Sequence, residues 1–176
     1  MIEIKDKKNC VGCTACAEIC PKKCIQMKPD EEGFLYPVVD KSRCVECNAC
    51  NTVCPIQSPV DEKEKLQKAY LVQHCDEKVR LDSSAGGAFT AIATVVLQRG
   101  GVVFGAAYDE NFHVQHTYVE AVNELKRFRN SKYVQSDLGD SFCLVKDFLQ
   151  KDRWVCFSGT PCQIEGLSKL LRKPYE

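Results

Sequence analysis

Residues 10–21 read CVGCTACAEICP, and residues 44–55 repeat the pattern as CVECNACNTVCP. Both runs have the form C-x2-C-x2-C-x3-C-P, and each copy is too short to bury a core by itself. The repeat therefore predicts two halves of one pseudo-symmetric unit. The segment between the runs, CIQMKPDEEGFLYPVV, has two strand-like stretches around the turn signal PDEEG at residues 29–33, which predicts a hairpin.

The cysteine spacing predicts two 4Fe-4S clusters. Three thiolates on one tight loop cover three iron corners of a cubane, and the chain carries the fourth cysteine away to the other cluster. The two predicted ligand sets are Cys10, Cys13, Cys16 and Cys54, and Cys44, Cys47, Cys50 and Cys20. The alternatives are structural zinc, which usually takes separated C-x2-C pairs, and a disulfide scaffold. Cys24 falls outside the pattern and is interpreted as a small buried apolar residue rather than a ligand.

Composition narrows the class of protein. Nine of the 13 cysteines precede residue 55, and 24 basic residues balance 24 acidic ones. A net charge of zero gives no field that would attract nucleic acid or an anionic membrane. The start MIEIKDKKNC lacks a signal-peptide pattern, and no apolar run approaches the roughly 20 residues of a membrane helix. We therefore expect a cytoplasmic protein with reduced thiols, no membrane span and no nucleic-acid partner.

The rest of the chain changes character. Residues 59–69, which begin with a proline and hold a cluster of charges, predict a linker, and an α/β pattern begins near residue 70. A helix capped by Ser83 or Ser84 should run through GGAFTAIATVVLQR to the glycines at 100 and 101. VVFGAAY and HVQHTYVE predict strands, and VNELKRFR and DSFCLVKDFLQ predict helices. Residues 151–176 predict a strand (RWVCF), a turn and a helix (QIEGLSKLL), while His113 and His116 are interpreted as surface residues.

Three stretches are candidates for binding. The helix start SAGG at residues 84–87, with Thr90 one turn later, suits a phosphate, although an ordinary helix cap is the competing interpretation. The group Ser131, Lys132 and Tyr133 is a weak signal by itself. Thr160, Pro161 and Gln163 predict a capping box, which places Cys162 in the first helical turn, where the dipole favours a thiolate. Cys162 is thus a candidate cluster ligand, redox thiol or flavin contact, or a buried cysteine in a well-capped helix.

Two resemblances cover most of the chain. Residues 1–58 resemble a bacterial-type two-cluster ferredoxin. SAGG at 84–87, GVVFGAAY at 101–108, NSKYVQ at 130–135 and GTPCQIEGL at 159–167 resemble, in this order, the beta subunit family of coenzyme F420 hydrogenase/dehydrogenase. This family resemblance implies an iron–sulfur flavoprotein, in which FAD lies between the clusters and a hydride-carrying substrate such as coenzyme F420. It implies a flavin neighbourhood of Ser84, Gly86, Gly87, Thr90, Ser131, Lys132 and Tyr133, and it puts Gly159, Thr160 and Cys162 at the flavin or at a further cluster.

The expected fold is an α+β ferredoxin-like two-cluster module over residues 1–58, followed by an incomplete α/β domain. Residues 70–150 resemble the amino-terminal region of the beta subunit, and residues 151–176 resemble the start of its carboxyl-terminal domain, which continues further in the family. The expected function is an oxidoreductase subunit that moves electrons between a reduced cofactor, through FAD, and two 4Fe-4S clusters. Its partner would be a redox protein or a larger oxidoreductase complex. The competing hypotheses are a ferredoxin-type carrier or docking subunit without its own flavin, and a zinc-stapled interaction module.

Overall fold

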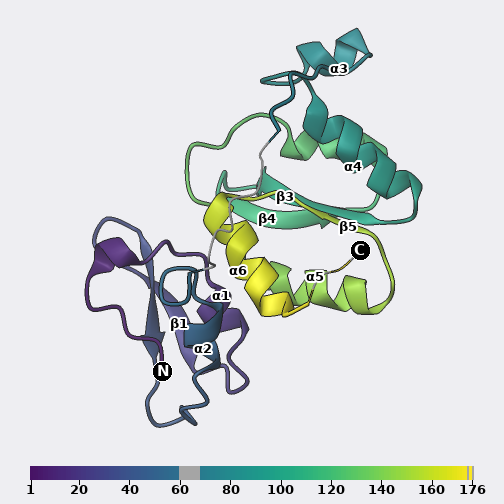
Figure 1. Cartoon of the computed structure of the whole chain (residues 1–176). Helices are drawn as coiled ribbons and strands as arrows, with labels where there is room; N and C mark the ends of the chain where they lie inside the picture. The colour runs from purple at the N-terminus through teal and green to yellow at the C-terminus, as the bar shows by residue number, and fades with distance from the viewer. Residues whose placement is uncertain (60–67, 174, 176) are drawn as a thin grey trace. The chain divides into compact units, whose positions relative to one another are not determined.

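The computed structural model describes residues 1–59, 68–173 and 175. They form two compact units, which Figure 1 traces along the chain. The first unit comprises the described residues of Met1–Glu62 and Thr160–Glu176, and the second comprises those of Lys63–Gly159. Each unit is a small mixed α/β structure, with a two-stranded sheet in the first and a three-stranded sheet in the second. Most of the predicted linker lies outside the described residues.

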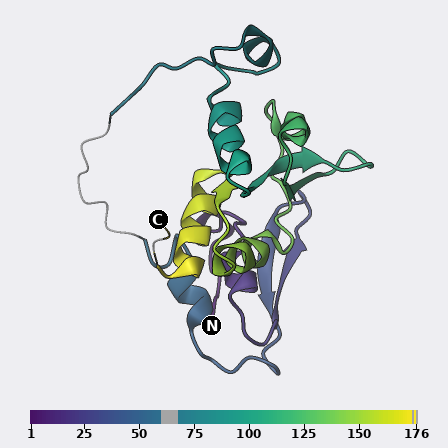
Figure 2. The same cartoon turned by 90° about the vertical axis from the view of Figure 1, so that its right-hand side faces the viewer.

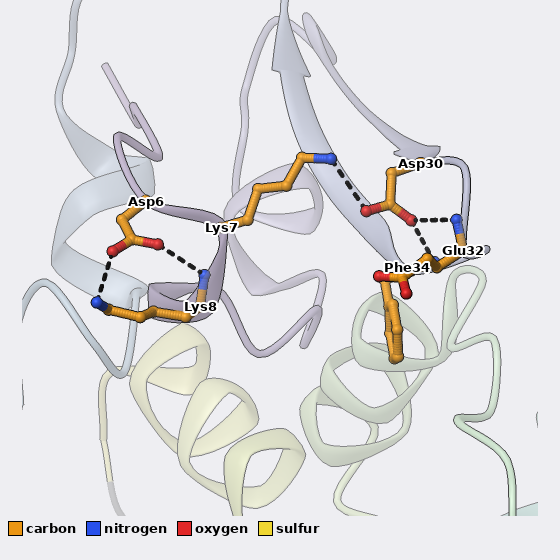
Figure 3. Close-up of polar contacts among 6 residues, drawn as sticks. All are labelled: Asp6, Lys7, Lys8, Asp30, Glu32 and Phe34. Carbon is orange, nitrogen blue, oxygen red and sulfur yellow. Dashed lines mark hydrogen bonds and ion pairs between the residues drawn. The ribbon is translucent and has the colours of Figure 1, made fainter.

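The predicted hairpin is present in the first unit. Strands β1 (Ile25–Pro29) and β2 (Leu35–Val39) pair antiparallel, with Ile25 opposite Val39. The side chain of Asp30 shapes the turn by accepting the backbone N–H groups of Glu32 and Phe34 at 3.1 and 3.0 Å (Figure 3).

Lys7 ties the amino-terminal segment to this turn. It begins the short 3-10 helix η1 (Lys7–Asn9), and its ammonium group donates to the Asp30 carboxylate at 3.0 Å (Figure 3). This hydrogen bond is the main reason that the pKa of Asp30 lies below its ordinary value.

Three helices surround the cysteine runs of the first unit. Helices α1 (Ala15–Glu18) and α2 (Ala49–Val53) each begin inside one run, and both contact α6 (Pro161–Leu171), as Figures 1 and 2 show. The predicted capping box starts α6: the Gln163 side chain accepts the Thr160 N–H at 2.9 Å, with Pro161 at the first helical position. The strand and helix predicted within residues 151–176 belong to different compact units.

The second unit is a sheet between helices. Its strand order is β4 (Val114–Val119), β3 (Val102–Tyr108), β5 (Val155–Phe157); β3 is antiparallel to β4 and parallel to β5. Helices α4 (Ala88–Gln98) and α5 (Ser141–Gln150) cover opposite faces of this sheet (Figure 1). The remaining elements are α3 (Glu77–Leu81) and the 3-10 helix η2 (Val122–Phe128).

The alternation of side chains along the strands explains these two layers. Val103 and Val119 are paired in register and pack with Leu125 of η2 and residues of α4 in one core. The next residue, Phe104, points to the other face, where its ring lies 6.1 Å from that of Phe148 in α5. Both faces of β3 are therefore buried, as its unbroken apolar sequence VVF predicts.

Two local predictions were wrong. Neither Ser83 nor Ser84 caps α4: its N-cap is Gly87, whose φ of +81° is the left-handed conformation that glycine adopts without strain. His116 is buried rather than on the surface, because β4 directs it under Phe157, with ring centroids 5.1 Å apart. Its Nε2 donates to the Ser158 carbonyl at 2.9 Å, so Nδ1 accepts the Ser136 hydroxyl at 2.8 Å.

Within the described residues, no helix has both the length and the apolar character that a membrane crossing requires.

Candidate metal centres

The two cysteine runs adopt the same backbone conformation. Gly12 and Thr14 have φ of +60° and +58°, and their counterparts in the second run, Glu46 and Asn48, have +53° and +61°. Left-handed residues alternating with right-handed or extended ones turn successive N–H groups toward one side of a loop. Such concave nests of backbone N–H groups bind anions and occur at iron–sulfur sites. The repeat in the sequence is thus a repeat in structure, including at positions where the residue types differ.

The first cysteine cavity lies in the first unit. Cys10, Cys13 and Cys16 of the first run line it together with Cys54 of the second run. Apolar side chains close its other walls, among them Ile4, Met27, Pro37 and Ile56.

At the second cysteine cavity the roles of the two runs are exchanged. Cys44, Cys47 and Cys50 of the second run line it together with Cys20 of the first. The backbone N–H of Ile2 donates to the Cys50 sulfur at 3.0 Å, a type of contact that stabilises negative charge on a cysteine sulfur. All eight predicted metal ligands therefore line one of two cavities, in the crossed sets of four that the spacing predicts.

Burial controls the ionisation of the thiols at the first cavity. Desolvation raises the pKa of Cys13 to about 11 and that of Cys16 to about 12, and neighbouring cysteines add to both shifts. Desolvation also raises the pKa of Cys10. Such thiols stay protonated at neutral pH unless a cationic centre takes the place of the proton, as iron does when it binds thiolates.

The donor set fits an iron–sulfur cluster. Four cysteines line the first cavity and five, including Cys24, line the second, and N–H nests lie beside them. The Thr14 hydroxyl adds a further group: it lines the first cysteine cavity, it is buried, and it has no hydrogen-bond partner among the described residues. Among the residues that the structure describes, no three His, Cys, Asp or Glu side chains converge on the position of a single metal ion. The cysteines surround the two cavities instead.

Two further cysteines lie beside these cavities. Cys24 is 3% exposed and lines the second cysteine cavity, with its sulfur 3.4 Å from that of Cys20. The hydrogen bond to Cys20 raises the pKa of Cys24 to about 11. Cys162, in the first turn of α6, lies near enough to Cys13 to raise the pKa of that thiol, and its sulfur is 3.1 Å from the Thr160 hydroxyl.

Helix α6 is fixed against the first cysteine cavity. At Gly166, an added Cβ would lie 3.1 Å from the Cβ of Ala15 and 3.4 Å from the sulfur of Cys13, so a side chain at this position would press on α1. Lys169 donates to the Ser58 carbonyl and pairs with Glu165 at 3.1 Å. The cysteine spacing gives no sign of this helix, which lies more than 100 residues further along the chain.

The second unit contains a separate open cleft. The predicted flavin residues Ser84, Gly86, Gly87, Thr90 and Ser131 all line it. The other predicted flavin residues are not among its described lining residues: Lys132, Tyr133, Gly159, Thr160 and Cys162. Lys132 instead donates to the carbonyls of Arg127 and Arg129 at 3.1 and 2.7 Å, and Tyr133 is 94% exposed.

One glycine that lines this cleft, Gly86, is explained by packing alone. Gly86 is close to a neighbouring segment, where an added Cβ would lie 2.2 Å from the carbonyl oxygen of Val72, and its own carbonyl accepts the His74 N–H at 2.6 Å. The glycine that resembles a phosphate-binding residue is therefore required for packing whether or not a phosphate binds.

Sequence reasoning missed other polar residues of the cleft. Arg129 lines it, pairs with Asp82 at 3.2 Å, and has a buried Nε with no hydrogen-bond partner among the described residues. The buried Thr90 hydroxyl also has no hydrogen-bond partner among the described residues. Asn130 accepts the Ser84 hydroxyl at 2.9 Å. Buried polar atoms are rarely left unpaired, so Arg129 and Thr90 mark where a polar ligand would be stabilised.

Comparison with known proteins identifies one part of the chain. Residues 9–58 match the family model of the 4Fe-4S dicluster domain. No curated protein matches the chain. The chain thus carries an iron–sulfur domain of the two-cluster type, which supports an electron-transfer role and implies a redox partner.

Proposed function

We propose that this chain transfers single electrons through two 4Fe-4S clusters with crossed ligands. The first cluster would be held by Cys10, Cys13, Cys16 and Cys54, and the second by Cys20, Cys44, Cys47 and Cys50. One observation carries the proposal: each cavity is lined by the first three cysteines of one run and the fourth of the other, with Cys24 as a fifth cysteine at the second cavity. The dicluster domain over residues 9–58 supports it independently.

The surroundings of the sulfurs assign different roles to the two sites. A bound cluster takes up and gives back one electron at a time. At the first site, Cys13 and Cys16 are each 8% exposed, and apolar side chains line much of the cavity. At the second site, Cys47 is exposed and the neighbouring Val45 is 56% exposed. We infer that electrons pass to or from the redox partner across this open edge.

A flavin is the second element of the proposal. The cleft of the second unit lies at the amino-terminal end of α4, where free N–H groups favour a phosphate. The unpaired Nε of Arg129 and hydroxyl of Thr90 would satisfy polar atoms of such a ligand. FAD is the cofactor that the family resemblance implies. Because a flavin accepts a hydride and releases single electrons, it would connect a hydride donor such as coenzyme F420 to one-electron clusters.

The alternative is a ferredoxin-type carrier or docking subunit that binds no flavin. The structural role of Gly86 favours it, since the glycine is needed for packing alone. A zinc-stapled interaction module is the third candidate.

Anaerobic purification of the full chain, with iron, sulfide, zinc and flavin measured together, separates these functions. We expect about eight irons and eight sulfides per chain, the content of two cubanes. Zinc in place of iron after strictly anaerobic reconstitution would exclude both electron-transfer functions.

Titration with FAD then tests the flavin. We expect Arg129→Gln to weaken FAD binding, because it removes the charged group of the cleft. Arg99→Gln is the matched control, since Arg99 is exposed at the opposite end of α4. A chain that holds eight irons and binds no FAD would refute the flavin proposal and support the ferredoxin-type carrier function.

A further inference from the structure

Cys24 occupies a position at the second cysteine cavity that the repeat does not explain. Its side chain is 3% exposed, and its sulfur lies 3.4 Å from that of Cys20, within hydrogen-bond distance for sulfur. Cys24 thus contacts Cys20, one of the four predicted ligands of the second site, and it lines the same cavity as the other three.

The backbone fixes Cys24 in this place. It directly precedes β1, and its carbonyl accepts the Asp40 N–H at 2.8 Å, which closes the base of the hairpin. This hydrogen bond holds the backbone of Cys24, and the side chain is buried away from water. The contact with Cys20 is therefore a fixed feature of this unit.

The direction of the hydrogen bond follows from the ligand assignment, so this inference depends on the proposed function. A cysteine that ligates iron is a thiolate and has no proton to donate. Of the pair, only Cys24 then keeps an S–H group. Its proton must point at a ligand sulfur, where it stabilises negative charge.

At the first site, a serine stands at the position equivalent to Cys24. The counterparts of Cys20 and Cys24 in the repeat are Cys54 and Ser58. The Ser58 hydroxyl donates to the Asn51 carbonyl at 3.1 Å instead of to a cysteine sulfur. Cys24 therefore breaks the pseudo-symmetry of the two sites.

We propose that Cys24 is a positioning residue that raises the reduction potential of the second cluster, by donating a hydrogen bond to the sulfur of Cys20. Reduction adds negative charge to the cluster and its ligands, so a donor at a ligand sulfur stabilises the reduced state more than the oxidised state. A thiol is a weak donor, and we expect its removal to lower the equilibrium constant for reduction about threefold to tenfold. Tenfold corresponds to about 59 mV for one electron.

Redox titration of the anaerobically purified full chain, followed by electron paramagnetic resonance, tests this proposal. The variants are Cys24→Ala, Cys24→Ser, which keeps a donor, and Cys156→Ala, which removes a partly buried thiol from the second unit. The signal of the first cluster is identified by its loss in Cys13→Ser. We expect Cys24→Ala to lower the potential of the second cluster alone, Cys24→Ser to stay closer to the wild type, and Cys156→Ala to change neither.

Three results would overturn the inference: an unchanged second cluster in Cys24→Ala, an equal shift of both clusters, or equal shifts in the alanine and serine variants, which would indicate lost packing. A wild-type chain that holds no iron would instead refute the proposed function, so the two failures are distinct.

Discussion

Replacing Gly166 by valine tests whether α6 is part of the first metal site. Gly166 lies on the face of α6 that meets α1, opposite Ala15 and Cys13. Ala15 is fully buried and Cys13 is 8% exposed, so a side chain added at Gly166 would meet both inside the unit rather than at its surface.

The size of the effect follows from these contacts. A Cβ at 3.1 Å from Ala15 is about 0.3 Å closer than the 3.4 Å lower limit of ordinary contact, and valine adds two methyl groups beyond it. Overpacking of this kind costs about 1–3 kcal/mol. Because one of the displaced groups is a predicted ligand, the first cluster should also be lost or bound less tightly.

Urea unfolding followed by the visible absorption of the clusters, together with iron analysis, measures both effects. Ser168→Val is the matched control, because Ser168 is exposed on the same helix and receives the same β-branched side chain. We expect a lower unfolding midpoint and less iron in Gly166→Val than in Ser168→Val. Equal midpoints and equal iron in the two variants would refute the packing of α6 against the first site.

Two other changes probe single buried groups. Thr14→Val keeps the shape of the side chain and removes the hydroxyl that has no partner among the described residues at the first cysteine cavity. The reduction potential of the first cluster should therefore fall while that of the second stays the same. A shift of the second cluster in redox titration would contradict this expectation. Burial lowers the pKa of His116 below its ordinary 6.5, so the unfolded chain binds more protons just below pH 6.5 and stability falls as the pH drops through that region. His116→Gln should flatten this slope when unfolding is followed by the fluorescence of Trp154, the one tryptophan of the chain, and an unchanged slope would assign it to another group.

The sequence predicts best where the chemistry is local. The two cysteine runs, the hairpin between them and the capping box at Thr160 each depend on residues a few positions apart, and all are present. Thr14 and Asn48 are a different case. Both adopt the left-handed conformation, although only the spacing of the cysteines, and no glycine, indicates it.

Predictions from the sequence fail where distant segments meet. The packing of Gly166 against Cys13 joins positions more than 150 residues apart, and no periodicity reports it. The burial of His116 depends on Phe157 of another strand. Arg129 belongs to no motif, yet it supplies the charged group of the cleft. Cys24 was correctly expected to be buried, but its contact with Cys20 depends on how the hairpin folds back.

The crossed ligand set is the central claim, and the spectrum of Cys54→Ser tests it most directly. Cys13→Ser and Cys47→Ser serve as references, because each removes a ligand of one cluster under either assignment. The account predicts that Cys54→Ser loses the same signal as Cys13→Ser, although Cys54 is the near neighbour of Cys47 in sequence. Loss of the signal that disappears in Cys47→Ser would contradict it.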